Sequence, residues 1–343
     1  MDRLGIIFGG KSGEHEVSLL SAKAVIDAFE GSDHELVLIG ITKEGQWKTY
    51  KGPTENIADG TWEKTAEDFP VHELGEVIDF AFPVLHGPYG EDGTIQGLFE
   101  MMDVPYAGCG VLASSLCMDK VAAKMIFERE GLPSCGYELV HGEDLKDKME
   151  EVLDRLEEKL PYPMFVKPSN MGSSVGISKA RTREQLRSGL IAAAKYDRRL
   201  IIEEGLNCRE VETGVIGNYY PEAAAVGEII QKQDFYDYEA KYTDDAGTEL
   251  SIPAELSEET YEKIREYAIR AYKVMDCSGF SRIDFFVEKE SGKIYLNEIN
   301  TIPGFTRYSM FPSLWKEAGV GFTELVERIV KLGYERYYAK NHR

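Results

Sequence analysis

Apolar runs and helical repeats alternate over the first hundred residues. Residues 4–8 are an apolar run that ends at a pair of glycines, and apolar positions then recur at helical spacing: Val17, Leu20, Ala24 and Ala28. Two more apolar runs occupy residues 35–42 and 79–85, and another helical repeat follows them: Ile95, Leu98, Phe99 and Met102. Buried strands that alternate with helices in this way predict a parallel α/β layer.

The rest of the chain mixes helices and strands in a less regular order. The 3.6-residue repeat predicts helices at residues 115–130, 145–160 and 261–275. Thr182 and Gln185 have the spacing of a capping box at the start of another helix. Strands are expected at residues 164–167, 200–203, 211–216, 223–230 and 280–288. This order predicts helices packed on antiparallel sheets, and the polar segment 231–253 is expected to be a loop that orders over a ligand.

Composition narrows the class of protein. The chain has 343 residues, of which 43% are hydrophobic and 29% charged, so it has the composition of a globular protein with a large core. Its 60 acidic and 39 basic residues give a net charge of -21. Such a charge repels nucleic acid and anionic membranes, so neither is expected as a partner. Any phosphate ligand must be held by local positive charge.

The five cysteines form no C-x-x-C pair and are odd in number, which argues against a disulfide framework or a cysteine zinc site. A reducing compartment is expected. The N-terminus lacks the apolar core of a signal peptide, and no apolar run approaches the roughly 20 residues of a membrane span. These features predict a cytoplasmic protein.

A predicted hairpin near the C-terminus carries the clearest chemistry. Alternation places apolar side chains on one face of residues 281–288: Ile283, Phe285 and Val287. Arg282 and Asp284 then share the other face. A three-residue loop at 290–292 would set Asp284 opposite Glu298, and Arg282 opposite Asn300. Opposed carboxylates need a positive charge between them, and an all-oxygen set suits Mg²⁺. The alternative is a solvated polar face of the hairpin.

Three other segments place polar residues at strand ends. Residues 167–176 follow a strand with glycines and serines that suit phosphate oxygens, although a flexible turn would have a similar composition. His86 ends a strand where open α/β sheets bind ligands, but a structural histidine is equally compatible. Glu91 and Asp92 could simply cap the next helix, and Glu14 could be an acidic residue in a first helical turn.

Six segments, in this order, together resemble the D-alanine–D-alanine ligases of the ATP-grasp superfamily: GGKSGEHEVSLLSA (9–22), FPVLHGPYGEDGTIQG (82–97), FVKPSNMGSSVGISKA (165–180), FYDYEAKY (235–242), GFSRIDFF (279–286) and LNEINTIPGFTRYS (296–309). The resemblance spans nearly the whole chain. It implies a mixed α/β and α+β protein, an ATP-grasp fold with an N-terminal Rossmann-like domain. The implied domains are 1–109, 110–203 and 204–343, the last with the mobile loop 231–253.

The resemblance also implies where ATP and metal bind. The phosphates would contact Lys120, Lys167, Ser173, Ser174 and Lys241. Adenine and ribose would contact Glu203, Glu204, Leu206 and Glu210, although Gly205 stands where relatives often carry an aromatic residue. Two Mg²⁺ ions, with Mn²⁺ as an alternative, would bind the residues that the hairpin already indicated: Asp284, Glu298 and Asn300.

Substrate roles follow in the same way. Glu14, helped by His86, would hold the ammonium group of the first D-alanine. Arg282 and the backbone at Gly304 would stabilise the oxyanion. Ser309 and Lys241 would hold the carboxylate of the second substrate or the neighbouring phosphates, with Met310 beside them. Ser173 and Tyr242 would link loop closure to Glu14. The expected catalytic set is Glu14, Ser173, Tyr242, Arg282 and Ser309.

The implied activity is ATP-dependent joining of two D-alanine molecules through an acyl phosphate, for peptidoglycan precursor synthesis and with a homodimer as the implied assembly. Ligases for D-lactate or D-serine are the nearest alternatives. No histidine lies between His141 and His342, which argues against D-lactate, and Met310 replaces the arginine expected for D-serine. A non-catalytic ATP-binding protein of the same fold would be expected to lose Arg282 or the metal ligands, and all are present.

Overall fold

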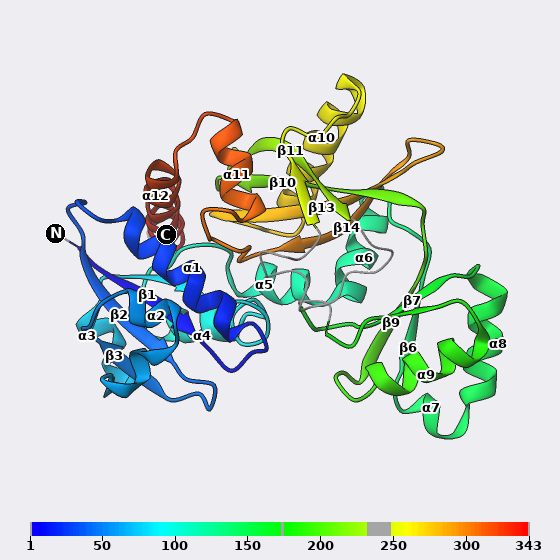
Figure 1. Cartoon of the computed structure of the whole chain (residues 1–343), viewed down its shortest axis with the longest axis horizontal. Coiled ribbons are helices and arrows are strands. Elements are labelled where there is room, and N and C mark those ends of the chain that lie inside the picture. The colour runs from blue at the N-terminus through cyan, green and yellow to red at the C-terminus, as the bar shows by residue number, and fades with distance from the viewer. Residues whose placement is uncertain (1, 173–174, 232–247, 342–343) are drawn as a thin grey trace.

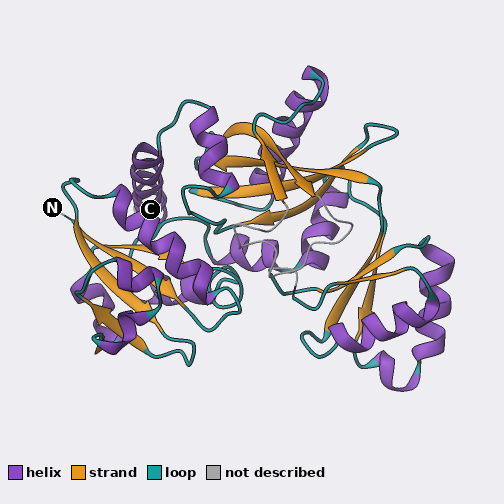
Figure 2. Cartoon of the chain, in the orientation of Figure 1, coloured by secondary structure: helices purple, strands orange, loops and turns teal. Residues whose placement is uncertain are grey.

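The computed structural model describes residues 2–172, 175–231 and 248–341 (Figure 1). Three sheets organise this part of the chain, and helices cover them (Figure 2). None of the helices in the described ranges is long and apolar enough to cross a membrane.

The first sheet has the strand order β4-β3-β2-β1-β5. Its elements and their connecting helices are β1 (Arg3–Gly9), α1 (His15–Ala28), β2 (Glu35–Ile41), β3 (Trp47–Tyr50), α2 (Glu55–Ala58), β4 (Glu67–Asp68), α3 (Leu74–Val77), β5 (Phe80–Val84) and α4 (Thr94–Met101), with short 3-10 turns at Thr61–Lys64 and Val71–Glu73. β1 pairs in parallel with β2 and β5, as predicted. The antiparallel edge of β3 and β4 was not predicted. Leu20 of α1 is 44% exposed, so one predicted core position faces outward.

The central sheet is antiparallel throughout, as predicted, in the order β6-β9-β7-β8. It comprises β6 (Tyr137–His141), β7 (Met164–Pro168), β8 (Ser178–Ala180) and β9 (Arg199–Glu204), with α7 (Asp144–Asp147), α8 (Met149–Lys159) and α9 (Arg183–Ala193) beside it (Figure 2). The Thr182 hydroxyl caps α9 by accepting the Gln185 N–H group. The helix predicted over 145–160 is interrupted at Lys148 and so forms α7 and α8.

The third sheet has the order β12-β11-β10-β13-β14. Its elements are β10 (Cys208–Ile216), β11 (Glu222–Gln231), β12 (Thr248–Ser251), α10 (Glu258–Val274), β13 (Phe280–Glu288) and β14 (Ile294–Asn300), followed by α11 (Met310–Glu317) and α12 (Phe322–Asn341). Part of the segment 231–253, which was predicted to be loop, is instead the strand β12, because these residues pair with β11. Residues 232–247 of that segment lie outside the described ranges.

Two helices join the central unit to the third sheet. The single helix predicted from residue 115 is instead α5 (Val111–Met118) and α6 (Lys120–Arg129), since Asp119 is extended and caps α6. Both helices bury side chains such as Ala113 and Phe127 in the core of the third sheet. Similarly, α12 buries Ile329 in the same core as Phe80 of the first sheet. Two hydrophobic cores therefore extend across the expected domain boundaries, and the division into 1–109, 110–203 and 204–343 stays a proposal.

Candidate active site

A cavity of about 620 Å³ is lined by strands of the central and third sheets, and by α1 and the loops that follow β1 and β5 of the first sheet. Thirteen residues predicted to form the site line it: Glu14, His86, Lys120, Lys167, Glu203, Glu204, Leu206, Glu210, Arg282, Asp284, Glu298, Asn300 and Gly304. Four predicted residues lie outside the described ranges: Ser173, Ser174, Lys241 and Tyr242. The motifs that are separated in sequence are thus brought to one place by the fold.

The β13–β14 hairpin has the predicted pairing at the site, but for a different reason. Asp284 lies opposite Glu298, and Arg282 lies opposite Asn300. The loop has four residues, 289–292, rather than the three expected, because Glu288 N–H bonds to Lys293 O. The register then shifts next to Asp284, where Asn297 is the additional residue of β14. This bulge offsets the longer loop and restores the predicted pairs.

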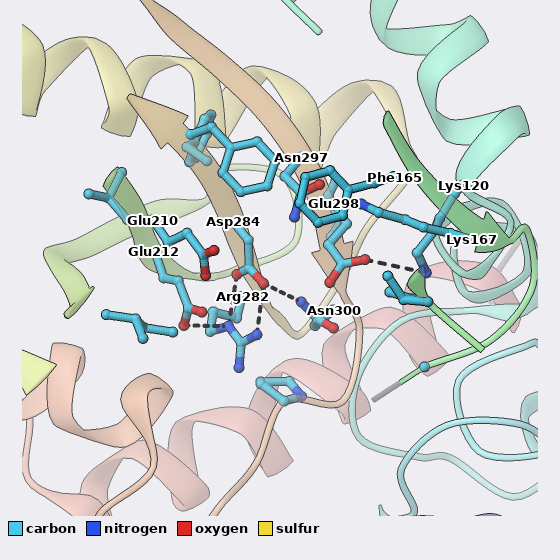
Figure 3. Close-up of a pocket in the computed structure, with 18 of the residues that line it drawn as sticks. Lys120, Phe165, Lys167, Glu210, Glu212, Arg282, Asp284, Asn297, Glu298 and Asn300 are labelled. Carbon is cyan, nitrogen blue, oxygen red and sulfur yellow. Dashed lines mark hydrogen bonds and ion pairs between the residues drawn. The ribbon is translucent and has the colours of Figure 1, made fainter. Parts of the chain in front are cut away.

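Protein cations neutralise the opposed carboxylates of this hairpin (Figure 3). Arg282 donates two hydrogen bonds of 2.8 Å to Asp284. Its Nε also lies 2.7 Å from the Glu212 carboxylate on β10. Burial opposes the charged form of Arg282, but Asp284 and Glu212 outweigh it and raise the pKa of the guanidinium. Lys120 Nζ lies 3.4 Å from Glu298, so each carboxylate already has a positive neighbour.

These ion pairs bear on the expected metal site. Among the described residues, no group of three or more His, Cys, Asp or Glu side chains is arranged to hold a metal ion. The predicted ligands are two carboxylates and one amide, and all three line the cavity. Asn300 Nδ2 donates a 2.8 Å hydrogen bond to Asp284, so the oxygen donors lie in adjacent positions. An oxygen set that leaves positions for water and phosphate suits Mg²⁺, and these residues fit it.

The two predicted phosphate-binding lysines are held in place by other residues. Lys120 Nζ donates a 2.8 Å hydrogen bond to Met171 O, at the start of the glycine-serine loop. Lys167 pairs with the Glu203 carboxylate, which also accepts Lys124 Nζ at 2.8 Å. Burial would raise the pKa of Glu203, but the two lysines dominate and lower it well below its usual value. Glu203 is thus a buried ion-pair partner, a role that the sequence did not indicate.

The surroundings expected for adenine contain aromatic residues that sequence reasoning missed. Phe165 and Phe286 both line the cavity. Glu204 is the last residue of β9, and its carboxylate accepts the Gly136 N–H group at 2.6 Å. A Cβ atom at Gly205 would lie 2.7 Å from the carbonyl oxygen of Pro163, so this chain has no room for an aromatic side chain there.

Both ring nitrogens of His86 have partners within the protein. Its Nδ1 lies 2.8 Å from Ile302 O, and its Nε2 lies 3.1 Å from Ser21 Oγ. Burial is the main cause that lowers its pKa, which favours the neutral ring. A neutral ring with Nδ1–H donating to Ile302 has no free nitrogen for an ammonium group. His86 is thus attached to Ile302, in the loop before Gly304, and its predicted help to Glu14 stays a prediction.

Glu91, for which a helix-capping role was one alternative, lines the cavity. Asp92 lies just before Gly93, the N-cap of α4, and its carboxylate accepts the Thr94 N–H group at 3.0 Å. Burial, followed by the nearby Glu14 charge, raises the pKa of Glu91 well above its usual value. The Glu14 carboxylate occupies space that Gly87 leaves open, since a Cβ there would lie 2.6 Å from Glu14 Oε2.

The two predicted residues at the start of α11 are not among the described residues that line the cavity. Ser309 Oγ accepts the Thr306 N–H group at 3.0 Å, next to the lining residue Gly304. Met310 is 6% exposed and packs against Gly227 of β11 in the core. The first turn of α11 directs this side chain into the sheet, and its predicted contact with the substrate stays a prediction.

Comparison with known proteins identifies the class of enzyme. Residues 3–109 match the family described as "D-ala D-ala ligase N-terminus", and residues 126–331 match "D-ala D-ala ligase C-terminus". The chain therefore belongs to the D-alanine–D-alanine ligase family. This confirms the expected ATP-grasp fold with its N-terminal Rossmann-like domain.

Individual relatives agree over nearly the full length. A D-alanine–D-alanine ligase of Ruminiclostridium cellulolyticum is 50% identical, over 98% of this chain and 96% of that protein. One from Acetivibrio thermocellus is 48% identical over the same shares of both chains. Among solved structures, the VanG D-Ala:D-Ser ligase of Enterococcus faecalis is 36% identical, with a TM-score of 0.88 over 97% of this chain and 99% of that one.

Proposed function

We propose that this protein joins two D-alanine molecules into D-alanyl-D-alanine and converts ATP to ADP and phosphate, as a step in making peptidoglycan precursors. The observation that carries the proposal is the cavity, where Lys120 and Lys167 lie near the acidic hairpin and Arg282. The match to ligases of that name at 46–50% identity supports the same substrates.

The chemistry requires an activated carboxylate, because a carboxylate oxygen is a poor leaving group. Transfer of the γ-phosphoryl group to one D-alanine forms an acyl phosphate, and the amine of the second D-alanine displaces phosphate from it. Mg²⁺ bound by Asp284, Glu298 and Asn300 would neutralise charge on the phosphates. Lys120 and Lys167 are the phosphate-binding side chains in this proposal.

Two further roles concern the substrates. Glu14, at the start of α1, would bind the ammonium group of the first D-alanine. This role of Glu14 does not require His86. Arg282, held by Asp284 and Glu212, would donate hydrogen bonds to the oxyanion, together with the backbone at Gly304. Ser309, Lys241, Ser173 and Tyr242 keep the roles in substrate binding and loop closure that the family resemblance implies.

Phosphate release with D-alanine and ATP tests the reaction. D-alanine-dependent release of ADP and phosphate is expected, and formation of AMP and pyrophosphate would contradict the mechanism. Activity should disappear with a chelator and return with Mg²⁺ or Mn²⁺. Activity that survives chelation would remove the metal from the proposal.

Competition between equal concentrations of D-alanine, D-lactate and D-serine, read by mass spectrometry, tests the second substrate. The D-alanine dipeptide should predominate. The likeness to a D-Ala:D-Ser ligase structure makes D-serine the main competitor. A predominance of the mixed dipeptide would replace the substrate assignment and leave the ligase mechanism in place.

A further inference from the structure

A buried group of three charged side chains lies at the wall of the cavity, and only part of it faces the ligand. The Glu203 carboxylate receives Lys124 on Oε1 at 2.8 Å and Lys167 on Oε2. The side chains of Lys124 and Glu203 are 1% and 3% exposed, and that of Lys167 is 12% exposed. Two ammonium groups thus share one carboxylate almost out of contact with water.

Lys124 cannot be a ligand of the nucleotide in this arrangement. It is not among the described residues that line the cavity, whereas Lys167 and Glu203 are. Its ammonium group is buried behind the cavity wall, 3.4 Å from Sγ of the lining residue Cys135 and 5.8 Å from the centre of the Tyr137 ring. Burial opposes the charged form of Lys124, but Glu203 and Cys135 outweigh it and raise its pKa, so it remains an ammonium.

The charge balance explains why a second lysine is needed. When Lys167 binds a phosphate, its attraction to Glu203 is weakened or lost. A buried carboxylate left without a partner is strongly unfavourable, so a simple Lys167–Glu203 pair would resist opening. With Lys124 in place, Glu203 stays paired whichever direction Lys167 takes. The group also carries a net positive charge, which suits an anionic ligand.

We infer that Lys124 is a positioning residue for nucleotide binding: by holding Glu203, it leaves Lys167 free to turn to the phosphates of ATP. The inference rests on the proposed function only as far as it places ATP in this cavity. It concerns nucleotide affinity, which can be measured without D-alanine.

The test compares the affinities of the protein for ATP and for adenosine by isothermal titration calorimetry. In Lys124→Met, Lys167 stays paired with Glu203, so ATP affinity should decrease about tenfold or more while adenosine affinity changes less than about threefold. If Lys124 has a purely structural role, the substitution should weaken the binding of both ligands alike or of neither. An unchanged ratio of the two affinities in folded protein would overturn the inference.

A second pair of variants separates the effect from misfolding. In Glu203→Gln the carboxylate is absent, so Lys167 can turn to the phosphates whether or not Lys124 is present. Adding Lys124→Met to this variant should therefore leave the ratio of the ATP and adenosine affinities unchanged. A further decrease of that ratio in the double variant would contradict the inference, even if the single Lys124→Met protein does not fold. If the wild-type protein releases no phosphate when D-alanine is added, that result counts against the proposed reaction and not against this inference, because nucleotide binding is measured separately.

Discussion

Arg282 is held from two sides by carboxylates, and this restraint gives its guanidinium a defined direction in the cavity. Asp284 receives two of its N–H groups, and Glu212 on the neighbouring strand lies 2.7 Å from Nε. A planar fork held in this way presents its remaining N–H groups at fixed angles. Glu212 was not identified from the sequence, although it lies two residues from the predicted Glu210.

We expect Arg282→Lys to reduce kcat by about 100-fold or more, because one ammonium cannot reproduce the fork that reaches two carboxylates and an oxyanion. KM for D-alanine should change little. Steady-state kinetics test this, with Arg187→Lys as a control, since Arg187 pairs with Glu150 at the surface. An increase in KM with unchanged kcat would place Arg282 in substrate binding instead.

Asp284→Asn should sharply lower turnover and increase the Mg²⁺ concentration needed for half-maximal activity, because it removes one anionic ligand of the proposed site. Glu298→Gln should act in the same direction. Titration of activity with Mg²⁺ measures the effect, and the exposed Asp147→Asn is the matched control. If the Mg²⁺ dependence of either variant matched that of the wild type, the substituted residue would not be a metal ligand.

His86 links folding to pH. Because burial lowers its pKa in the folded state, the unfolded chain binds more protons than the folded chain as pH decreases below about 6.5. Stability from this group is therefore present above that pH and is lost below it, by at most about 1.4 kcal/mol per pH unit. Denaturant unfolding at pH 7.5 and 5.5 should show a smaller loss in His86→Gln than in the wild type. Equal losses would exclude the effect.

At the scale of elements, Asp119 is the junction between α6 and the central sheet. Its Oδ1 accepts the Ala122 N–H group and the Ser169 hydroxyl, and its Oδ2 accepts Arg199 at 2.7 Å. The extended backbone at Asp119 ends α5 and starts α6, which carries Lys120 to the cavity. The helical periodicity predicted one helix, because a capping residue does not interrupt the apolar repeat from which a helix is predicted.

Asp119→Ala should destabilise the protein by about 1–3 kcal/mol, because it removes a helix cap and the partner of a partly buried arginine. Thr182→Ala, which removes only the exposed cap of α9, should cost about 1 kcal/mol or less. Urea unfolding compares the two variants. If both cost the same, the contacts of Asp119 with Ser169 and Arg199 contribute nothing beyond the cap.

At the scale of the whole molecule, the cavity joins cores that the chain order keeps apart. It is lined by strands of two sheets and by α1 and loops of the first unit, and α12 packs on the first sheet beside α1 (Figure 1). A ligand that contacts several units stabilises them together because it binds only the assembled form. Nucleotide binding should thus be visible in the unfolding of the entire chain.

ATP with Mg²⁺ at 100 times its Kd should add about 2.7 kcal/mol to the free energy of unfolding, seen as an increase in Tm. Lys167→Met should remove most of the increase at the same ATP concentration, while Glu203 stays paired with Lys124. Thermal melts with and without nucleotide measure both. An equal increase in the variant would mean that Lys167 does not bind the phosphates.

The sequence by itself determined the class of fold, the antiparallel central sheet and the pairing of Asp284 with Glu298. Alternation and helical periodicity are local properties, and they remain readable wherever one face of an element is buried. The hairpin pairing was also reached from local signals, although a four-residue loop and a bulge at Asn297 replaced the three-residue loop expected.

The tertiary structure alone decided which polar side chains support the others. Lys124, Glu212 and Glu91 have no local signal that separates them from surface charges, and Met310 has none that separates a pocket residue from a core one. Their environments are set by strands and helices distant in sequence, as when Glu203 of β9 meets Lys124 of α6. The burial of a charge and the identity of its partner depend on long-range packing, which no local pattern records.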